Sequence, residues 1–111
     1  MKTMYVTDLD GTLLNTKDKI NPESIRIINS LVEKGMLFTY ATARSLSSAS
    51  VVAKGLNTQI PVIVYNGAFI ICPNTGEILY SLSFTPEERE FVRMNLEKNN
   101  VSPLVYAFEY F

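Results

Sequence analysis

The chain has 111 residues with 10 basic and 11 acidic side chains, and its net charge of −1 gives no electrostatic reason to expect nucleic acid or an anionic membrane as a partner. It has no histidine and a single cysteine, Cys72, which excludes histidine-based catalysis, His-ligated zinc, an internal disulfide and a thiolate metal cage. Apolar runs stay far below the roughly 20 residues that span a bilayer, so we expect a soluble, cytoplasmic chain.

The first half of the chain predicts alternating strands and helices. Residues 4–7 are an apolar run that ends at Asp8, which is typical of a buried strand before a polar turn. A helix is expected between the capping residue Asn21 and the stop at Gly35. Residues 36–41 and 61–65 predict further strands, with a second helix over about 47–54. This alternation predicts right-handed crossovers and a parallel sheet in an α/β fold.

After residue 66 the pattern changes. Residues 68–72 and 78–82 flank a turn-forming stretch and predict a β-hairpin. A capping box from Thr85 to Glu88 precedes a helix to about Lys98, with Phe91 and Met94 expected to face inward. Residues 104–111 predict another strand, inside which the chain stops. Because typical sheets have roughly four to six strands, we expect this chain to be the front piece of a longer protein.

Polar signals follow each of the three expected parallel strands. They are the stretch 8–12, the pair Thr42 and Arg44, and the pair Asn66 and Gly67. Ligands of an open parallel sheet bind beyond the carboxyl ends of its strands. We therefore expect these three segments to converge in space.

Asp8 and Asp10 lie two residues apart, and on an extended segment both side chains would point to the same side. Two nearby carboxylates repel each other unless they share a proton or a cation such as Mg²⁺, which also neutralises an incoming phosphate. One aspartate can attack phosphorus to form an aspartyl-phosphate, and a second carboxyl can act as general acid and base. Gly11 lets the backbone approach an anion, and Thr42 offers a hydroxyl to a phosphoryl oxygen.

Other interpretations of the same residues stay open. The stretch at Asp8 is also compatible with a simple Asp-rich turn after a strand. A calcium loop is excluded, because Leu13 and Lys19 stand where its glycine and glutamate would be. Arg44 either contacts a substrate phosphate or supports the site from the surface, and Asn66 either contacts substrate or shapes a turn.

Residues 8–14, DLDGTLL in one-letter code, resemble the first motif of the haloacid dehalogenase-like (HAD) hydrolases, D-x-D-G-T-L. Residues 15–17, 41–44 and 65–68 are similar to the Cof-type branch of sugar-phosphate and other small-metabolite phosphatases. The resemblance covers roughly residues 3–84 well. It implies a partial doubly wound, Rossmann-like parallel sheet: residues 1–83 would be the front of a HAD-like core, with a hairpin and linker at 68–83, and residues 84–111 the start of an α+β cap.

The resemblance also implies a function. The chain would belong to Mg²⁺-dependent phosphoric monoester hydrolases that act on small phosphorylated metabolites through an aspartyl-phosphate. Asp8 would be the nucleophile and a metal ligand, and Asp10 would be the general acid and base, with its backbone carbonyl on the metal. The remaining implied contacts are with the phosphoryl group (Leu9, Gly11, Thr42, Arg44) and with substrate (Asn66, Gly67).

Some parts of the family pattern are missing. Ala43 stands where a glycine is usual, and no Gly-Asp pair or assignable third-motif lysine follows. Half of the active site is therefore expected here, which leaves two hypotheses. The chain is an incomplete phosphatase, or it is a non-catalytic truncated or split fragment that pairs with itself or with a missing C-terminal half through an open sheet edge.

Overall fold

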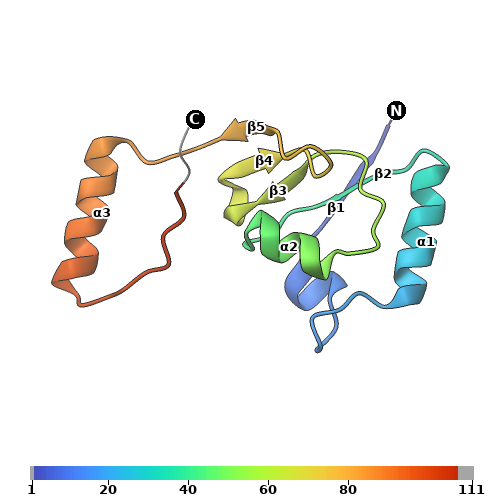
Figure 1. The fold of residues 1–111 in the computed structure, drawn as a ribbon, viewed down its shortest axis with the longest axis horizontal. Coiled ribbons are helices and arrows are strands. Elements are labelled where there is room, and N and C mark those ends of the chain that lie inside the picture. Colours follow the sequence, from blue (N-terminus) through green and yellow to red (C-terminus); the bar gives the residue numbers. More distant parts are fainter. Residues whose placement is uncertain (1, 108–111) are drawn as a thin grey trace.

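Two small sheets joined by short helices make up most of the computed structural model, which describes residues 2–107 (Figure 1). The elements in chain order are β1 (Met4–Thr7), η1 (Leu9–Leu13), α1 (Pro22–Glu33), β2 (Leu37–Tyr40), α2 (Leu46–Val52), β3 (Val62–Val64), η2 (Tyr65–Gly67), β4 (Phe69–Ile71), β5 (Ile78–Ser81) and α3 (Pro86–Lys98). The predicted order of strands and helices up to residue 98 is confirmed, with ends shifted by one or two residues.

The parallel part of the fold begins with β1 and β2, which α1 connects. They pair in parallel from Met4 opposite Leu37 to Thr7 opposite Tyr40. An isolated parallel bridge between Ala41 and Ile63 attaches β3 to the far side of β2. The α/β fold with a parallel sheet is thus confirmed, although β3 makes most of its hydrogen bonds in the other sheet.

The second sheet is antiparallel in the order β3-β4-β5. Val62 lies opposite Ile71 and Val64 opposite Phe69, while Ile70 pairs with Tyr80. The β4–β5 hairpin that the sequence predicts is confirmed. The sheet changes from parallel to antiparallel at β3, immediately before the residues that carry the third polar signal.

A small core lies between the sheets, α2 and η1. It consists of nine buried apolar residues: Leu9, Leu14, Ile20, Tyr40, Ala49, Ala53, Val62, Val64 and Ile71. The side chains of α1 cover it only partly, since no residue of that helix is fully buried. This core fixes the carboxyl ends of the parallel strands, where the polar signals lie.

The expected burial of β1 is wrong. Met4, Tyr5 and Val6 are 55%, 54% and 46% exposed. Within residues 2–107, β1 pairs only with β2, so its other edge and much of its surface face solvent (Figure 1). An apolar run reports that a strand is suited to burial, whereas its burial depends on the layers that pack over it.

Helix α3 stands apart from the sheets (Figure 1), and the expectation that Phe91 and Met94 face inward is wrong. These side chains are 70% and 58% exposed, and no residue of α3 is buried. The radius of gyration is 16.7 Å, against roughly 13 Å for a compact chain of this length. None of the helices described between residues 2 and 107 is long and apolar enough to cross a membrane.

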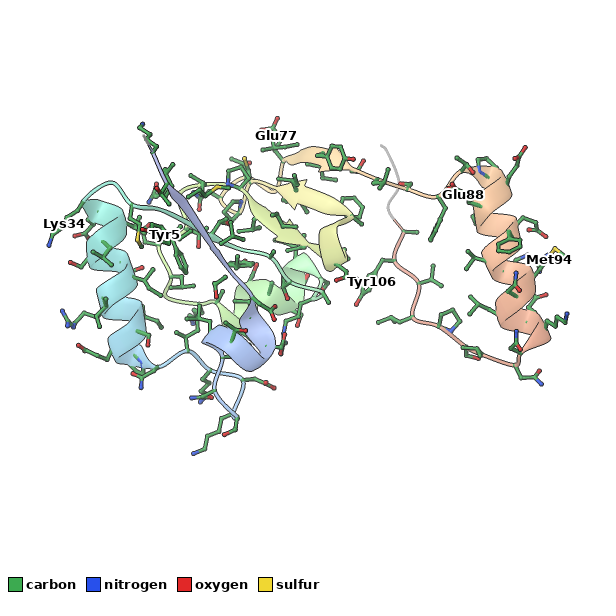
Figure 2. The ribbon with its side chains drawn as sticks, turned by 180° about the vertical axis from the view of Figure 1, so that it is seen from behind. Tyr5, Lys34, Glu77, Glu88, Met94 and Tyr106 are labelled. Atoms are coloured by element: carbon green, nitrogen blue, oxygen red, sulfur yellow. The ribbon has the colours of Figure 1, made fainter. Side chains whose placement is uncertain are left out.

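The segment after α3 returns to the sheets. The ring of Tyr106 meets Tyr65 edge to face, with 4.9 Å between centroids, and Figure 2 shows Tyr106 on the side of this segment that faces the sheets. The strand expected at 104–111 is wrong for residues 104–107, which form no regular structure. Its other residues, 108–111, lie outside the described part. Strand propensity alone does not make a strand where no partner strand accepts the hydrogen bonds.

Candidate active site

The first polar signal forms a wide turn, η1, directly after β1, in which Asp10 and Gly11 do not have helical backbone angles. Asp8 is extended (φ −78°, ψ 158°), and its Oδ1 accepts a hydrogen bond of 2.8 Å from the N–H of Leu9. The turn closes where the N–H of Leu14 donates to the carbonyl of Leu9 at 2.9 Å. The expectation of an extended segment is met at Asp8 and at Asp10 (φ −67°, ψ 125°), and it is wrong at Leu9, where the backbone curls between them.

Two features hold this turn in shape. The side chain of Leu9 is 0% exposed, so the residue between the two aspartates is anchored in the core. Gly11 has a φ of +76°, which favours glycine because a Cβ is strained in this left-handed region. The backbone that carries the Asp8 and Asp10 carboxylates is thus anchored to the core through Leu9.

A tight loop follows the turn and folds back beside it. An isolated antiparallel bridge between Leu14 and Ile20 closes the loop. Inside it, the Asn15 side chain accepts hydrogen bonds from the N–H groups of Lys17 and Lys19, at 2.9 and 3.1 Å. Asp18, at the tip, adopts a φ of +54°. We call residues 15–19 the Asp18 turn.

Arg44 connects the second polar signal to the first. Its Nε and Nη2 donate to the two carboxylate oxygens of Asp10, at 2.8 and 2.7 Å. These hydrogen bonds hold the pKa of Asp10 below its usual range, against the opposing effect of desolvation, and the charge of Arg44 adds to the lowering. Asp10 is therefore a carboxylate at neutral pH. The structure places Arg44 on the predicted general acid and base.

The third polar signal packs against the second through the backbone. The N–H of Asn66 donates to the carbonyl of Thr42, and the N–H of Tyr65 donates to the carbonyl of Arg44, both at 2.9 Å. The N–H of Thr42 donates to Ile63 at 3.0 Å. The three strand ends therefore converge as the sequence predicts.

The residues predicted to contact the phosphoryl group differ in whether their hydrogen-bond donors are already in use. Thr42 is 4% exposed, and its hydroxyl oxygen accepts a hydrogen bond of 3.1 Å from the N–H of Arg44. As an acceptor, this hydroxyl keeps its own proton for donation to a phosphoryl oxygen. The N–H of Leu9 already donates to Asp8, so a phosphoryl group would compete for it. Asn66 and Gly67 form an exposed turn with positive φ angles of 56° and 92°.

Sequence reasoning missed two residues that belong to this site. Ser48 accepts a hydrogen bond of 2.8 Å from Nη1 of Arg44, and an Asp18 carboxylate oxygen lies 3.7 Å from Nη2. The spacing of four residues between Arg44 and Ser48 is a signal that could have revealed the first contact. Asp18 gives no such signal, because its approach depends on how the turn folds back.

The oxygen donors at Asp8 and Asp10 fit Mg²⁺ in kind, since hard cations prefer carboxylate and carbonyl oxygens. Among residues 2–107, no three Asp, Glu, His or Cys side chains gather into a group that could hold a metal. Mg²⁺ commonly keeps several waters and takes one or two carboxylates, so two aspartates are within its usual range. Arg44 occupies the Asp10 carboxylate, which leaves Asp8 as the more accessible ligand.

The fold is that of the haloacid dehalogenase-like class of hydrolases. A sequence profile of the haloacid dehalogenase-like hydrolases matches residues 5–111, and the chain belongs to this family. The resemblance at residues 8–14 is thereby confirmed, as is the similarity to the Cof-type phosphatases.

Several curated relatives are phosphatases of small metabolites. An HMP-PP phosphatase from Serratia proteamaculans is 37% identical over 67 residues, which are 60% of this chain and 24% of that protein. A 5-amino-6-(5-phospho-D-ribitylamino)uracil phosphatase from Bacillus subtilis is 36% identical over 81 residues, 73% of this chain and 27% of that protein. The chain spans between about a quarter and about a third of the curated relatives it matches.

Solved structures share the fold. A phosphatase of the HAD superfamily from Bacteroides thetaiotaomicron superposes with a TM-score of 0.78 at 21% identity, over 90% of this chain and 37% of that one. A protein from Thermotoga maritima gives a TM-score of 0.70 at 32% identity, again over 90% and 37%. The arrangement of residues 2–107 thus matches about a third of each larger structure.

Proposed function

We propose that this chain carries the nucleophile half of a Mg²⁺-dependent phosphatase of small phosphorylated metabolites, which works through an aspartyl-phosphate. The observation that supports this proposal is the convergence of Asp8, Asp10 and Thr42 at the carboxyl end of the parallel sheet, where ligands of such folds bind. The names of the relatives support the same reaction class. The chain spans about a quarter to a third of these relatives. Phosphatase activity of a protein of their full length is therefore included in this proposal.

In the proposed reaction, the Asp8 oxygen that is not bonded to Leu9 attacks phosphorus, and the bond from phosphorus to the substrate oxygen breaks. A protonated Asp10 donates its proton to that leaving oxygen. Asp10 then takes a proton from water, the water oxygen attacks phosphorus, and Asp8 is released. Mg²⁺ held by the Asp8 carboxylate and the Asp10 backbone carbonyl would neutralise charge on the phosphoryl group.

The pairing of Arg44 with Asp10 affects when Asp10 can act as an acid in this reaction. A carboxyl that donates a proton must first be protonated, whereas the hydrogen bonds from Arg44 lower the pKa of Asp10. Asp10 must therefore gain a proton when substrate arrives, and a negatively charged phosphate beside Asp10 favours its protonation. In this proposal Thr42 donates its hydroxyl proton to the phosphoryl group throughout.

We also propose the division into a core front, residues 1–83, and the beginning of a cap, residues 84–111. The separation of α3 from the sheets supports it (Figure 1). In this division, Asn66 and Gly67 lie on the core side, next to Tyr65, which Tyr106 contacts from the cap side. Substrate choice would then depend on cap residues that approach this turn.

The test is hydrolysis of p-nitrophenyl phosphate by the full chain, with and without Mg²⁺. We expect weak, Mg²⁺-stimulated hydrolysis that Asp8→Asn abolishes and that Glu33→Gln, an exposed change outside the site, leaves in place. Beryllofluoride, which mimics a phosphoryl group, provides an assay without turnover. Its ¹⁹F NMR signal should appear with the chain and Mg²⁺ and be lost in Asp8→Asn. Hydrolysis and a ¹⁹F signal that both survive Asp8→Asn would remove Asp8 from the nucleophile role.

The alternative function, pairing of chains through an open sheet edge, is favoured by one observation. Strand β1 has β2 as its single strand neighbour within residues 2–107, and its side chains are half exposed. Unpaired strand edges invite pairing with another strand. Light scattering over a range of concentrations tests this: a dimer that Tyr5→Lys dissociates supports the alternative, and a monomer at every concentration contradicts it.

A further inference from the structure

Arg44 has a protein partner on each side of its guanidinium group. One side, Nε with Nη2, donates to both oxygens of Asp10. Nη1 donates to the hydroxyl of Ser48, and Nη2 also lies 3.7 Å from the Asp18 carboxylate. The Arg44 side chain is 23% exposed, whereas those of Asp10 and Asp18 are 51% and 69% exposed. The arginine is thus the most enclosed member of this charged cluster.

The backbone of Arg44 is fixed as well. Its N–H donates to the Thr42 hydroxyl, and its carbonyl accepts from the N–H of Tyr65. Ser48 lies one turn into α2, whose N-cap Ser45 accepts from the N–H of Ser48 at 3.2 Å. Hydrogen bonds therefore fix the backbone of both Arg44 and Ser48. A guanidinium in a bidentate pair then fixes the plane of its partner carboxylate.

This arrangement decides between the two roles left open for Arg44. A guanidinium has two edges that bind a phosphate or a carboxylate bidentately, the Nε–Nη2 edge and the Nη1–Nη2 edge. In this chain Asp10 occupies the first edge, while Ser48 at Nη1 and Asp18 beside Nη2 lie along the second. A phosphate would have to displace one of these partners before Arg44 could hold it bidentately.

We propose that Arg44 is a positioning residue that orients the Asp10 carboxylate, with Ser48 and Asp18 as its anchors, and that it is not the phosphate ligand. The catalytic consequence rests on the proposed function, while the positioning itself does not. Asp18 connects the Asp18 turn to the site, so a change at that turn is transmitted to Asp10 through one side chain. The Asp18 contact is exposed, so we expect it to contribute little to the stability of the fold.

The experiment follows the arginine Nε–H signals of the ¹⁵N-labelled full chain by NMR. The chain has four arginines, and Arg44→Lys identifies the signal of Arg44 by its loss. We expect this signal to be shifted and slow to exchange with water, to lose both properties in Asp10→Asn, and to stay in place when inorganic phosphate is added. A saturable shift of the Arg44 signal with phosphate, together with no response to Asp10→Asn, would overturn the proposal.

The anchors are tested in the same spectra. We expect Ser48→Ala and Asp18→Asn each to speed water exchange at Arg44 at least about twofold, with Asp18→Glu restoring the original rate. Glu90→Gln is the matched control, because Glu90 pairs with Arg93 in α3 and should move only the Arg93 signal. If neither Ser48→Ala nor Asp18→Asn changes the Arg44 signal, the anchoring role is refuted.

These spectra separate this inference from the proposed function, since they need no turnover. If the chain gives the expected spectra but does not hydrolyse p-nitrophenyl phosphate, the phosphatase proposal is refuted and the positioning of Asp10 by Arg44 is supported. Where the chain does hydrolyse p-nitrophenyl phosphate, Arg44→Lys should lower kcat about tenfold or more and leave KM within about twofold. A raised KM with unchanged kcat would instead assign Arg44 to phosphate binding.

Discussion

Residues 2–83 and residues 84–107 are held together by different kinds of interaction. In the first region, side chains far apart in sequence share a core, and Leu9, Tyr40 and Val62 are between 0% and 3% exposed. In the second region, no residue of α3 is buried, and the helix depends on its own capping box and on the pairing of Arg93 with Glu90 and Glu97. Local interactions suffice to define a helix there, but they do not fold the segment onto the rest.

The comparison indicates where stability resides. An isolated helix of 13 residues is marginal in water, because helix stability in proteins comes mostly from packing of an apolar face. The first region should therefore open only with global unfolding, whereas α3 should open locally at much lower cost. The catalytic candidates all lie in the first region, next to its core.

The largest expected effect tests the core. Leu9→Ala removes a fully buried side chain between the two aspartates and should lower the free energy of unfolding by about 2–5 kcal/mol. Phe91→Ala on α3 is the matched control and should cost less than about 0.5 kcal/mol, since its ring is 70% exposed. Urea unfolding followed by circular dichroism measures both. Equal losses would mean that α3 packs as tightly as the core.

A smaller effect is expected from the cap of α3. Thr85→Ala removes the side chain that accepts from the N–H of Glu88 at 3.2 Å and should cost about 1 kcal/mol of local helix stability. Amide hydrogen exchange should become faster within α3 and stay unchanged in β3 and β4. Thr85→Ser keeps the hydroxyl and serves as the control. Faster exchange throughout the chain would contradict the independence of the two regions.

A still smaller effect concerns the ion pairs on α3. Hydrogen bonds from Arg93, aided by its charge, lower the pKa of Glu90. A carboxyl whose pKa is lower in the folded state stabilises that state above its ordinary pKa of about 4.3, and this contribution is lost as pH falls through the lowered value. Protection of the α3 amides, taken relative to their intrinsic exchange rate at each pH, should therefore fall on acidification, and Arg93→Gln should reduce that dependence. The same acid dependence in Arg93→Gln as in the wild type would rule out the pair as its cause.

The smallest of these effects is the pH dependence of stability that comes from the buried phenol of Tyr40, and it shows only at alkaline pH. Burial raises the pKa of its phenol, so the folded state favours the neutral form. That contribution is complete below the ordinary value of about 10 and is lost as pH rises through the raised value. The urea midpoint should fall at alkaline pH and fall less in Tyr40→Phe. Tyr80→Phe, at a side chain that is 51% exposed, should behave like the wild type.

Much of the local structure can be predicted from the sequence. The capping residues Asn21 and Thr85 mark the starts of their helices because their side chains satisfy neighbouring N–H groups. The run 4–7 and the strands of the hairpin at 68–82 are likewise recognisable from short-range patterns. The order of the strands then predicts that Thr42 and Asn66 meet at one edge, as they do.

The features that could not be predicted from the sequence depend on contacts between residues far apart in the chain. The bidentate pair of Asp10 and Arg44 joins residues 34 positions apart, and no spacing rule indicates it. The exposure of β1 and of Phe91 follows from which layers pack over them, a property that an apolar pattern does not contain. The curl of the backbone at Leu9 likewise follows from anchoring of that side chain in the core.

The sequence by itself determined the family, the order of strands and helices, the helix caps and the aspartates that follow the first strand, because each depends on residues within a few positions of one another. Only the tertiary structure decided that Arg44 holds Asp10, that Ser48 and Asp18 hold Arg44, and that α3 stands apart. The physical reason is that hydrogen bonds between side chains and burial are set by distances through space, which chain folding creates.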